Sequence, residues 1–192
     1  GIAAIDKSTL SDTELMSLNV LEWDCDINLE AMTFKKDLMP IDQMWSKNLD
    51  FNQFASASNA QPFNSVDDYR KWLVRVDAYL VWLDTAMANM KQGITEGYVL
   101  PTPLIKKVIP QFETLAKGPA ESHLYYSPIQ QISEAFSKEE RDELIDTYTI
   151  MVNDKVIPAH QKMVDFLKNE YLPNGRSTSG MDATPLGSAY YD

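Results

Sequence analysis

The strongest helical pattern in the chain runs from residue 65 to residue 92. Ser65-Val66-Asp67-Asp68 forms a capping box in which Asp replaces the usual Glu, and Gly93 is a natural carboxy-terminal cap. Large apolar residues follow at helical spacing on one side: Trp72, Val76, Tyr79, Leu80, Leu83, Met87 and Met90. This pattern predicts a long helix of about seven turns with one core-facing side.

A second helix is predicted near the amino terminus. Ser11-Asp12-Thr13-Glu14 is a full capping box, and the apolar residues that follow predict an inward face: Leu15, Leu18, Leu21, Cys25, Leu29 and Met32. Cys25 is therefore expected to be a buried structural thiol and not a nucleophile. Another face carries the acidic row Glu22, Asp26 and Glu30, which we interpret as a solvated surface.

The remaining helices are interrupted by proline. A helix should begin near Thr102-Pro103, bend near Pro110 and end around Lys117, while residues 37–64 form a connector with a short helix around Asp42–Lys47. Ser137-Lys138-Glu139-Glu140 is another capping box, and it opens a helix that Pro158 should kink or split before it ends near Tyr171.

No stretch of the sequence shows the period-2 alternation of a half-buried strand. The sequence therefore predicts an all-α fold, an irregular bundle of four to six helices of which two are long, with no significant sheet. We divide the chain into a helical domain, residues 1–172, and an irregular carboxy-terminal segment, residues 173–192. That segment is rich in Gly, Pro and Ser yet closes on Tyr190 and Tyr191, as a loop that leads into a further element would.

Composition narrows the function classes. The formal charge of -11 opposes binding to nucleic acid and docking on an anionic membrane surface. A single cysteine excludes an intrachain disulfide framework and a thiolate zinc cluster. The sequence has no apolar run of about 20 residues that could span a bilayer. Because no basic-then-apolar leader follows Gly1, we expect any signal peptide to have been removed or never to have been present.

A search for reactive groups finds no catalytic centre. His123 and His160 are far apart and lack a zinc-binding spacing, and the chain has no nucleophile elbow and no phosphate-binding loop. We expect a packing or interface role for His123 and a capping or surface role for His160. Arg70 and Arg75 are expected to form structural salt bridges. The aromatic residues Trp72, Trp82, Tyr125 and Tyr126 suggest an alternative, in which a self-contained, non-enzymatic helical binding or interaction module surrounds an apolar pocket.

Three groups of short segments together resemble a known bacterial family. They are Gln61-Pro62-Phe63 with Asp67-Asp68-Tyr69, Trp72-Leu73 and Arg75; Met90–Ile94 with Gly97–Pro101; and Ile157-Pro158-Ala159 with Phe166-Leu167, Glu170–Pro173, Arg176 and Thr178-Ser179-Gly180. In this order and spacing the chain resembles the amino-terminal part of the domain of unknown function 885 family, and most of all its predicted lipoproteins from marine gammaproteobacteria.

The resemblance implies a much longer parent protein. Its members carry a His-Glu-x-x-Pro-Gly-His helix in their carboxy-terminal half, similar to zinc metallopeptidases of the gluzincin type. None of these ligands is present here, so the resemblance implies zinc for the full-length parent, no cofactor in this chain and no catalytic residue to carry over. It also implies export, to the periplasm or to a lipid anchor on the membrane.

These expectations combine into one hypothesis. The chain should be the amino-terminal helical fragment of an exported zinc-dependent peptidase-like protein of unestablished substrate, inert by itself. Its partners would be the missing carboxy-terminal half and a peptide-like substrate, and exposed apolar surface would favour a homodimer. The substrate-binding candidates are Arg176, Tyr190 and Tyr191, on the segment that leads into the missing half, and changing Arg176 should lower activity with stability intact.

Overall fold

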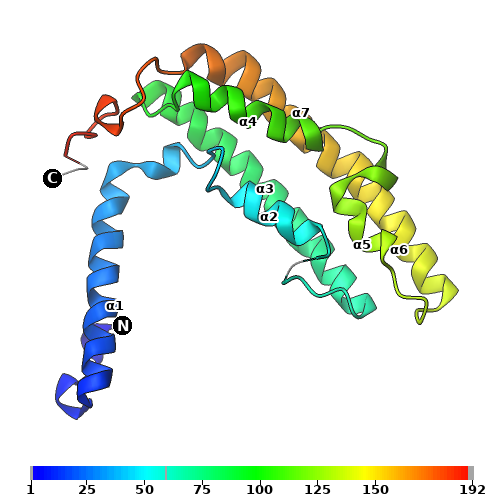
Figure 1. The fold of residues 1–192 in the computed structure, drawn as a ribbon, viewed down its shortest axis with the longest axis horizontal. Coiled ribbons are helices and arrows are strands. Elements are labelled where there is room, and N and C mark those ends of the chain that lie inside the picture. Colours follow the sequence, from blue (N-terminus) through cyan, green and yellow to red (C-terminus); the bar gives the residue numbers. More distant parts are fainter. Residues whose placement is uncertain (1, 59, 190–192) are drawn as a thin grey trace.

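The computed structural model describes residues 2–58 and 60–189 and consists of helices and their connections (Figure 1). The α-helices are α1 (Asp12–Ala31), α2 (Lys47–Ala55), α3 (Val66–Glu96), α4 (Thr102–Leu115), α5 (Ser127–Gln130), α6 (Lys138–Ile150) and α7 (Ile157–Phe166), and π-helical segments follow α6 (Met151–Val156) and α7 (Leu167–Tyr171). Short 3₁₀ turns cover Ile2–Ala4, Lys7–Thr9, Met32–Phe34, Lys36–Leu38, Ala120–Ser122, Leu124–Tyr126, Leu172–Asn174 and Met181–Ala183. In the described part of the chain no strand forms, and an isolated bridge joins Pro101 to Arg176. The predicted all-α class is confirmed.

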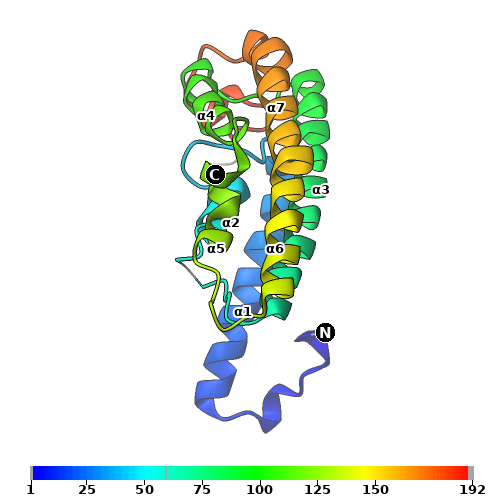
Figure 2. The same ribbon diagram turned by 90° about the vertical axis from the view of Figure 1, so that its right-hand side faces the viewer.

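Two long helical runs lie side by side and form the body of the molecule (Figures 1 and 2). One is α3, and the other is the continuous run from α6 through α7. The predicted apolar side of α3 is the buried one, and Trp72, Val76 and Met90 are fully inaccessible. α4 packs along α7, and α2 contacts α3 through the ring of Phe51, which stacks on Tyr79 with 4.3 Å between centroids.

The ends of α3 show one correction to the predicted caps. The capping box is confirmed, since the Ser65 amide donates to Oδ2 of Asp68 at 2.9 Å. The helix does not end at Gly93, however, but continues to Glu96 and is capped by Gly97 with a φ of 85°. Gly97 can adopt this left-handed conformation at little cost because it has no Cβ.

Gly93 has a different structural role, which is close packing. A Cβ at this position would lie 2.5 Å from the carbonyl oxygen of Tyr98 and 2.8 Å from that of Leu38. The backbone at Tyr98 and the backbone at Leu38 therefore approach α3 more closely than any side chain at position 93 would allow. The connectors that contain these two residues both pack against the end of the helix.

Pro158 does not split the second long run, because helical structure continues without a break from Lys138 to Phe166. The π-helical segment Met151–Val156 directly precedes α7, and Pro158 falls in the first turn of α7. A proline lacks the N–H that an α-helix would use there, and the wider π turn removes the need for that hydrogen bond. Pro110 does not interrupt its helix either, since α4 continues through it to Leu115.

The connector before α2 was predicted to be helical too early. Residues 42–46 form a turn in which Oδ1 of Asp42 accepts hydrogen bonds from the amides of Met44 and Trp45, at 2.6 and 2.5 Å. Such an Asx-type turn competes with helix formation, so α2 begins only at Lys47. The turn leaves the Trp45 side chain 84% exposed.

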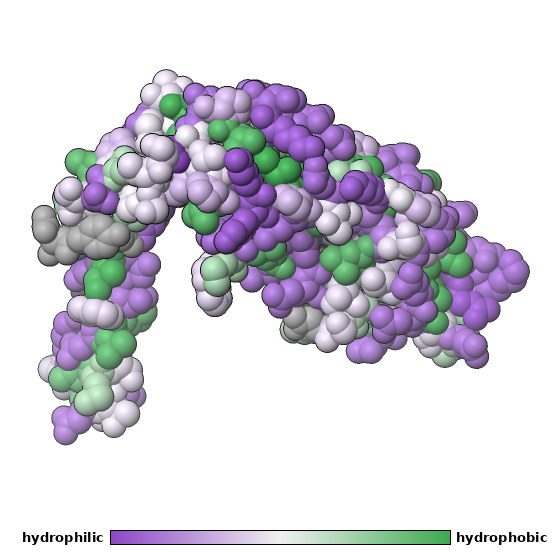
Figure 3. All heavy atoms as spheres, turned by 45° about the horizontal axis from the view of Figure 1, so that its top comes forward, coloured by the Kyte–Doolittle hydropathy of each residue, from purple (hydrophilic) through white to green (hydrophobic). Residues whose placement is uncertain are grey.

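The helix α1 projects away from the body, and its predicted inward face is wrong (Figure 1). Leu18 is its one buried residue, Cys25 is half-buried instead of buried, and Leu29 is exposed. On the neighbouring face Met16, Val20, Trp23 and Ile27 are 69%, 60%, 65% and 42% exposed. We call these four residues the α1 stripe. Hydrophobic side chains are visible along this projecting helix in Figure 3.

Substitution of Gly93 by alanine tests the close packing at the end of α3. Helix propensity alone would make this change stabilising by about 1 kcal/mol. We expect instead a loss of about 1–3 kcal/mol in the free energy of unfolding, because the new methyl group would clash with the backbone of Tyr98 and Leu38. Urea denaturation measures the effect, with Thr95→Ala on an exposed position of α3 as control. A Gly93→Ala protein as stable as the parent would contradict the packing described here.

Candidate functional site

Buried polar side chains meet where α3, α7 and the 3₁₀ turn Leu124–Tyr126 come together. Tyr79 of α3 and His160 of α7 are 3% and 0% exposed, and Tyr125 of the turn is also inaccessible. The Tyr79 hydroxyl lies 3.4 Å from Nε2 of His160, and the Tyr125 hydroxyl donates to Oδ1 of Asn52 at 2.9 Å. These contacts give the two hydroxyl groups and the imidazole a hydrogen-bond partner within the protein.

His160 is a neutral core residue and not the capping or surface residue that the sequence suggested. Its Nδ1 lies 2.7 Å from the carbonyl oxygen of Val156, which can only accept, so Nδ1 carries the proton and Nε2 is an acceptor. Burial lowers the pKa of His160 to about 4, and the hydrogen bond to Val156 only partly opposes this effect. A helical histidine can face the core here because the preceding turn supplies the carbonyl it needs.

The stability of the protein should depend on the protonation of His160. Its pKa is about 4 when folded and about 6.5 when unfolded, so the unfolded state binds the proton first as the pH falls. The stabilisation from a neutral His160 is complete above pH 6.5 and decreases toward pH 4. Between pH 6.5 and 5 we expect a loss of about 2 kcal/mol.

Urea denaturation at several pH values checks this expectation. The His160→Gln protein, which cannot titrate at this position, should have a lower stability at pH 7 and a flatter dependence between pH 6.5 and 5. An equally steep dependence in both proteins would assign the effect to other groups.

His123 has the packing role that the sequence predicted. It is 5% exposed, its Nδ1 accepts from the amide of Tyr125 at 3.2 Å, and its Nε2 lies 3.1 Å from the carbonyl oxygen of Leu115. Burial lowers the pKa of His123 as well. The ring thereby connects the end of α4 to the turn that carries Tyr125.

Arg176 holds the carboxy-terminal segment against the connector between α3 and α4. Its amide donates to the carbonyl of Leu100 at 3.2 Å, and its own carbonyl accepts from the amide of Thr102 at 2.9 Å. The guanidinium donates to the carbonyl oxygen of Val99 at 2.8 Å and also to those of Thr178 and Gly180. These hydrogen bonds hold the segment from Arg176 to Gly180 in place in this structure. The two other predicted site residues, Tyr190 and Tyr191, lie outside the described residues.

The described residues do not fit a metal centre. They include no group of three or more His, Cys, Asp or Glu side chains that could hold an ion. Both ring nitrogens of each histidine face protein groups, and in the acidic row Glu22 forms an ion pair with Lys7 at 2.7 Å. No α-helix of the described part is long and apolar enough to cross a bilayer.

The two arginines of α3 have different environments. Arg70 forms the expected salt bridge, with Nη2 2.9 Å from Oε1 of Glu143. Arg75 does not pair with a carboxylate in the described residues. Its guanidinium donates to Oε1 of Gln61 and lies over the ring of Phe54, 5.2 Å from the centroid.

A surface groove runs between α2 and α3, and we call it the α2–α3 groove. One lobe, of about 280 Å³, is lined by Lys47, Phe51, Arg75, Ala78, Tyr79 and Trp82. An adjoining lobe, of about 420 Å³, shares Lys47, Phe51 and Arg75 with the first and adds Asp50, Gln53 and Phe54. The sequence did not single out Lys47 or Phe51, although their i, i+4 spacing on α2 places them on one face.

The aromatic residues of the alternative reading are mostly core. Trp72 and Tyr125 are fully buried and Tyr126 is 7% exposed, so they do not surround an open pocket. Trp82 is the member of that set that lines the α2–α3 groove.

Comparison with known proteins places the chain in a family. The model of a family described as "Bacterial protein of unknown function (DUF885)" matches residues 2–192. The fold is similar to the crystal structure of the putative lipoprotein from Colwellia psychrerythraea, with a TM-score of 0.71 and 21% sequence identity. The similar region covers 79% of this chain and 26% of that chain. No curated protein matches the sequence significantly.

Proposed function

The chain belongs to the bacterial DUF885 family, and on this premise we propose that it is the amino-terminal helical part of a longer zinc-dependent peptidase-like protein. By itself this part performs no chemistry. It docks against the carboxy-terminal part of the same protein and helps to position a peptide-like substrate. Because the residues described here do not fit a zinc site, we place the zinc on the carboxy-terminal part.

The observation that carries this proposal is the α1 stripe. Its four apolar side chains follow the spacing 16, 20, 23, 27, which places them on one face of a helix that projects from the body (Figure 1). A shallow hollow of about 440 Å³ runs along that face and is lined in part by Met16, Val20 and Trp23. Apolar surface gathered in this way is typical of a face that packs against another protein segment.

The length of the similar crystal structure indicates which protein segment would pack against the α1 stripe. This chain spans 26% of that protein, so a relative of the same fold contains a large additional part against which such a face could pack. We therefore propose the carboxy-terminal part as the partner of the α1 stripe. The segment that begins at Arg176 would lead toward the carboxy-terminal part. Our candidates for contact with the substrate are still Arg176, Tyr190 and Tyr191.

Placement in the cell envelope is part of the proposal. The similar crystal structure is titled as that of a putative lipoprotein, and the family resemblance of the sequence implies export. We propose a periplasmic location, free or attached through a lipid anchor.

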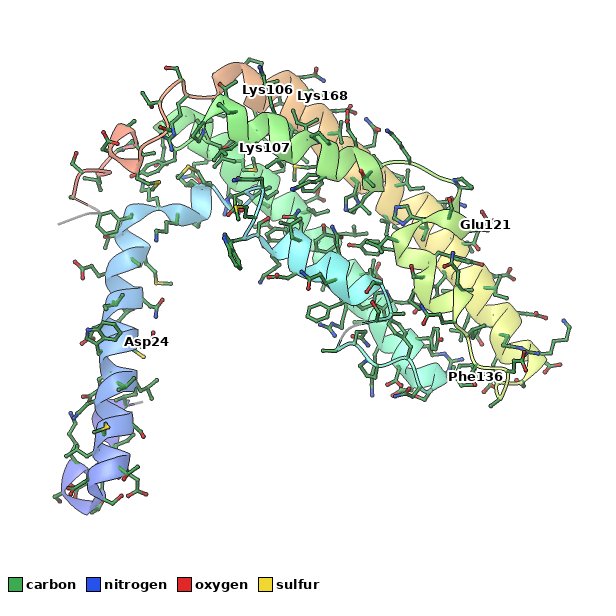
Figure 4. All side chains as sticks on the ribbon, in the orientation of Figure 1. Asp24, Lys106, Lys107, Glu121, Phe136 and Lys168 are labelled. Atoms are coloured by element: carbon green, nitrogen blue, oxygen red, sulfur yellow. The ribbon has the colours of Figure 1, made fainter. Side chains whose placement is uncertain are left out.

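Substitution of Trp23 by aspartate tests the docking face. In the 192-residue chain the side chain is 65% exposed, so the free energy of unfolding should change by less than about 0.5 kcal/mol. In the longer protein the same change would bury a charge, and we expect a loss of roughly 2 kcal/mol or more. Asp24→Asn, on the same helix, is the matched control and should be neutral in both proteins (Figure 4).

Denaturation curves of both proteins and light scattering of the chain decide the result. Equal and small effects in both proteins would contradict docking through α1. A concentration-dependent dimer of the chain that Trp23→Asp abolishes would instead assign the stripe to a second copy.

Metal analysis tests the placement of zinc. The longer protein should bind about one zinc ion and lose hydrolysis of a casein-type substrate when a chelator removes it, whereas the 192-residue chain should bind none. Stoichiometric zinc in the chain itself would contradict the proposal, as would a longer protein that neither binds zinc nor cleaves peptides.

A further inference from the structure

The α2–α3 groove has an aromatic wall made of stacked rings. Phe51 stacks on Trp72 with 4.8 Å between centroids and on Tyr79 with 4.3 Å, and Tyr79 stacks on Trp82 with 6.0 Å. Trp72 is fully buried, while Phe51 and Trp82 are half-buried at the groove. The stack is therefore anchored in the core and offers partly uncovered rings to a planar group in the groove.

Two cations lie beside this wall, and neither is neutralised. Lys47 and Arg75 line both lobes, and within the described residues neither forms an ion pair. Most other lysines of the molecule do, for example Lys162 with Asp84 at 2.7 Å. Asp50 lines the second lobe but forms no ion pair with either cation, and the lining of the first lobe includes no carboxylate. In a chain with a net charge of -11, the two cations therefore make the first lobe a local site for an anion.

Arg75 is oriented for such a role. Gln61 is 6% exposed; its side-chain oxygen accepts from Nη1 of Arg75, and its amide donates to the carbonyl of Pro62 at 3.0 Å. The ring of Phe54 supports the guanidinium from one side. A buried glutamine thus fixes one edge of the guanidinium, and the remaining N–H groups are available to a carboxylate.

We propose that the α2–α3 groove binds the carboxyl terminus of a peptide whose last residue is aromatic. The terminal carboxylate pairs with Arg75 and Lys47, and the terminal ring packs against Phe51 and Trp82. The lobe of about 280 Å³ suits one aromatic residue, and the second lobe, of about 420 Å³, receives the preceding residues. There, the carboxylate of Asp50 can accept a main-chain N–H of the peptide.

The two-lobed shape favours a peptide over a small aromatic acid. Lys47, Arg75 and Phe51 line both lobes, and the second lobe extends beyond them along α2. A small aromatic acid would fill only the first lobe and would leave the second one empty. The carboxylate also sets a salt dependence: screening of Lys47 and Arg75 should weaken binding as the ionic strength rises.

A titration of the 192-residue chain with peptides, followed by ¹H–¹⁵N correlation NMR spectra, tests the inference. The probes are acetyl-Ala-Ala-Phe with a free carboxylate, the same peptide as its carboxy-terminal amide, acetyl-Ala-Ala-Ala and acetyl-Phe. We expect the free acid to shift signals of α2 and α3, including the indole N–H of Trp82. The amide should bind about tenfold more weakly, because it lacks the charge. Acetyl-Ala-Ala-Ala, which lacks the terminal ring, and acetyl-Phe, which lacks the preceding residues, should also bind more weakly.

Matched variants test whether the two cations cause the difference in affinity between the free acid and the amide. Arg75→Gln and Lys47→Gln should each reduce affinity for the free acid toward that for the amide, while affinity for the amide stays unchanged. Both side chains are exposed, so the fold should be retained. Lys106→Gln removes the same charge from α4, outside the groove lining, and should change neither affinity (Figure 4).

Three results would overturn the inference. The first is equal binding of acid and amide, and the second is a set of shifts on α1 instead of the groove. The third is acetyl-Phe binding as tightly as the tripeptide, which would identify a small aromatic acid as the ligand. The inference rests on the proposed function only in its choice of a peptide as ligand. Because binding is measured on this chain without metal, its failure is distinguishable from a failure to find zinc in the longer protein.

Discussion

The contact between Phe51 and the aromatic side of α3 is the interaction on which the rest of the structure depends. The Phe51 ring attaches the short helix α2 to Trp72 and Tyr79, and Tyr79 in turn meets His160 of α7. The helices α2, α3 and α7 therefore converge on one cluster of rings. The stacked rings of this cluster form the wall of the α2–α3 groove, so the core and the candidate binding surface share a single packing arrangement.

The fold was predictable wherever one side of a helix both carries large apolar residues and packs within this chain. The α3 helix satisfies both conditions, and its buried side and capping box were confirmed. The α1 helix has an equally regular pattern, yet Leu18 is its one buried residue, because periodicity shows which side chains share a face and not what covers that face. Local rules also failed at Gly93, which packs against backbone instead of ending the helix, and at Pro158, where a π turn keeps the helical run unbroken.

The candidate site was only partly predictable. The sequence singled out Arg75 as a residue expected to form a salt bridge and Trp82 as a possible pocket residue, and both line the groove. Lys47 and Gln61 gave no such signal, since Lys47 meets residues of α3 and Gln61 meets Arg75 only in the folded chain. Arg176 was singled out for substrate contact from its place in the sequence; in the structure its donors bind backbone carbonyls, which a sequence pattern cannot show.

The central claim is that this helical part works by docking its projecting helix against the remainder of a longer protein. Amide hydrogen exchange across α1, compared between the 192-residue chain and the longer family protein, tests that claim most directly. The account predicts fast exchange along α1 in the chain by itself and strong protection in the longer protein, with α3 protected in both. Equal exchange along α1 in the two proteins would contradict it.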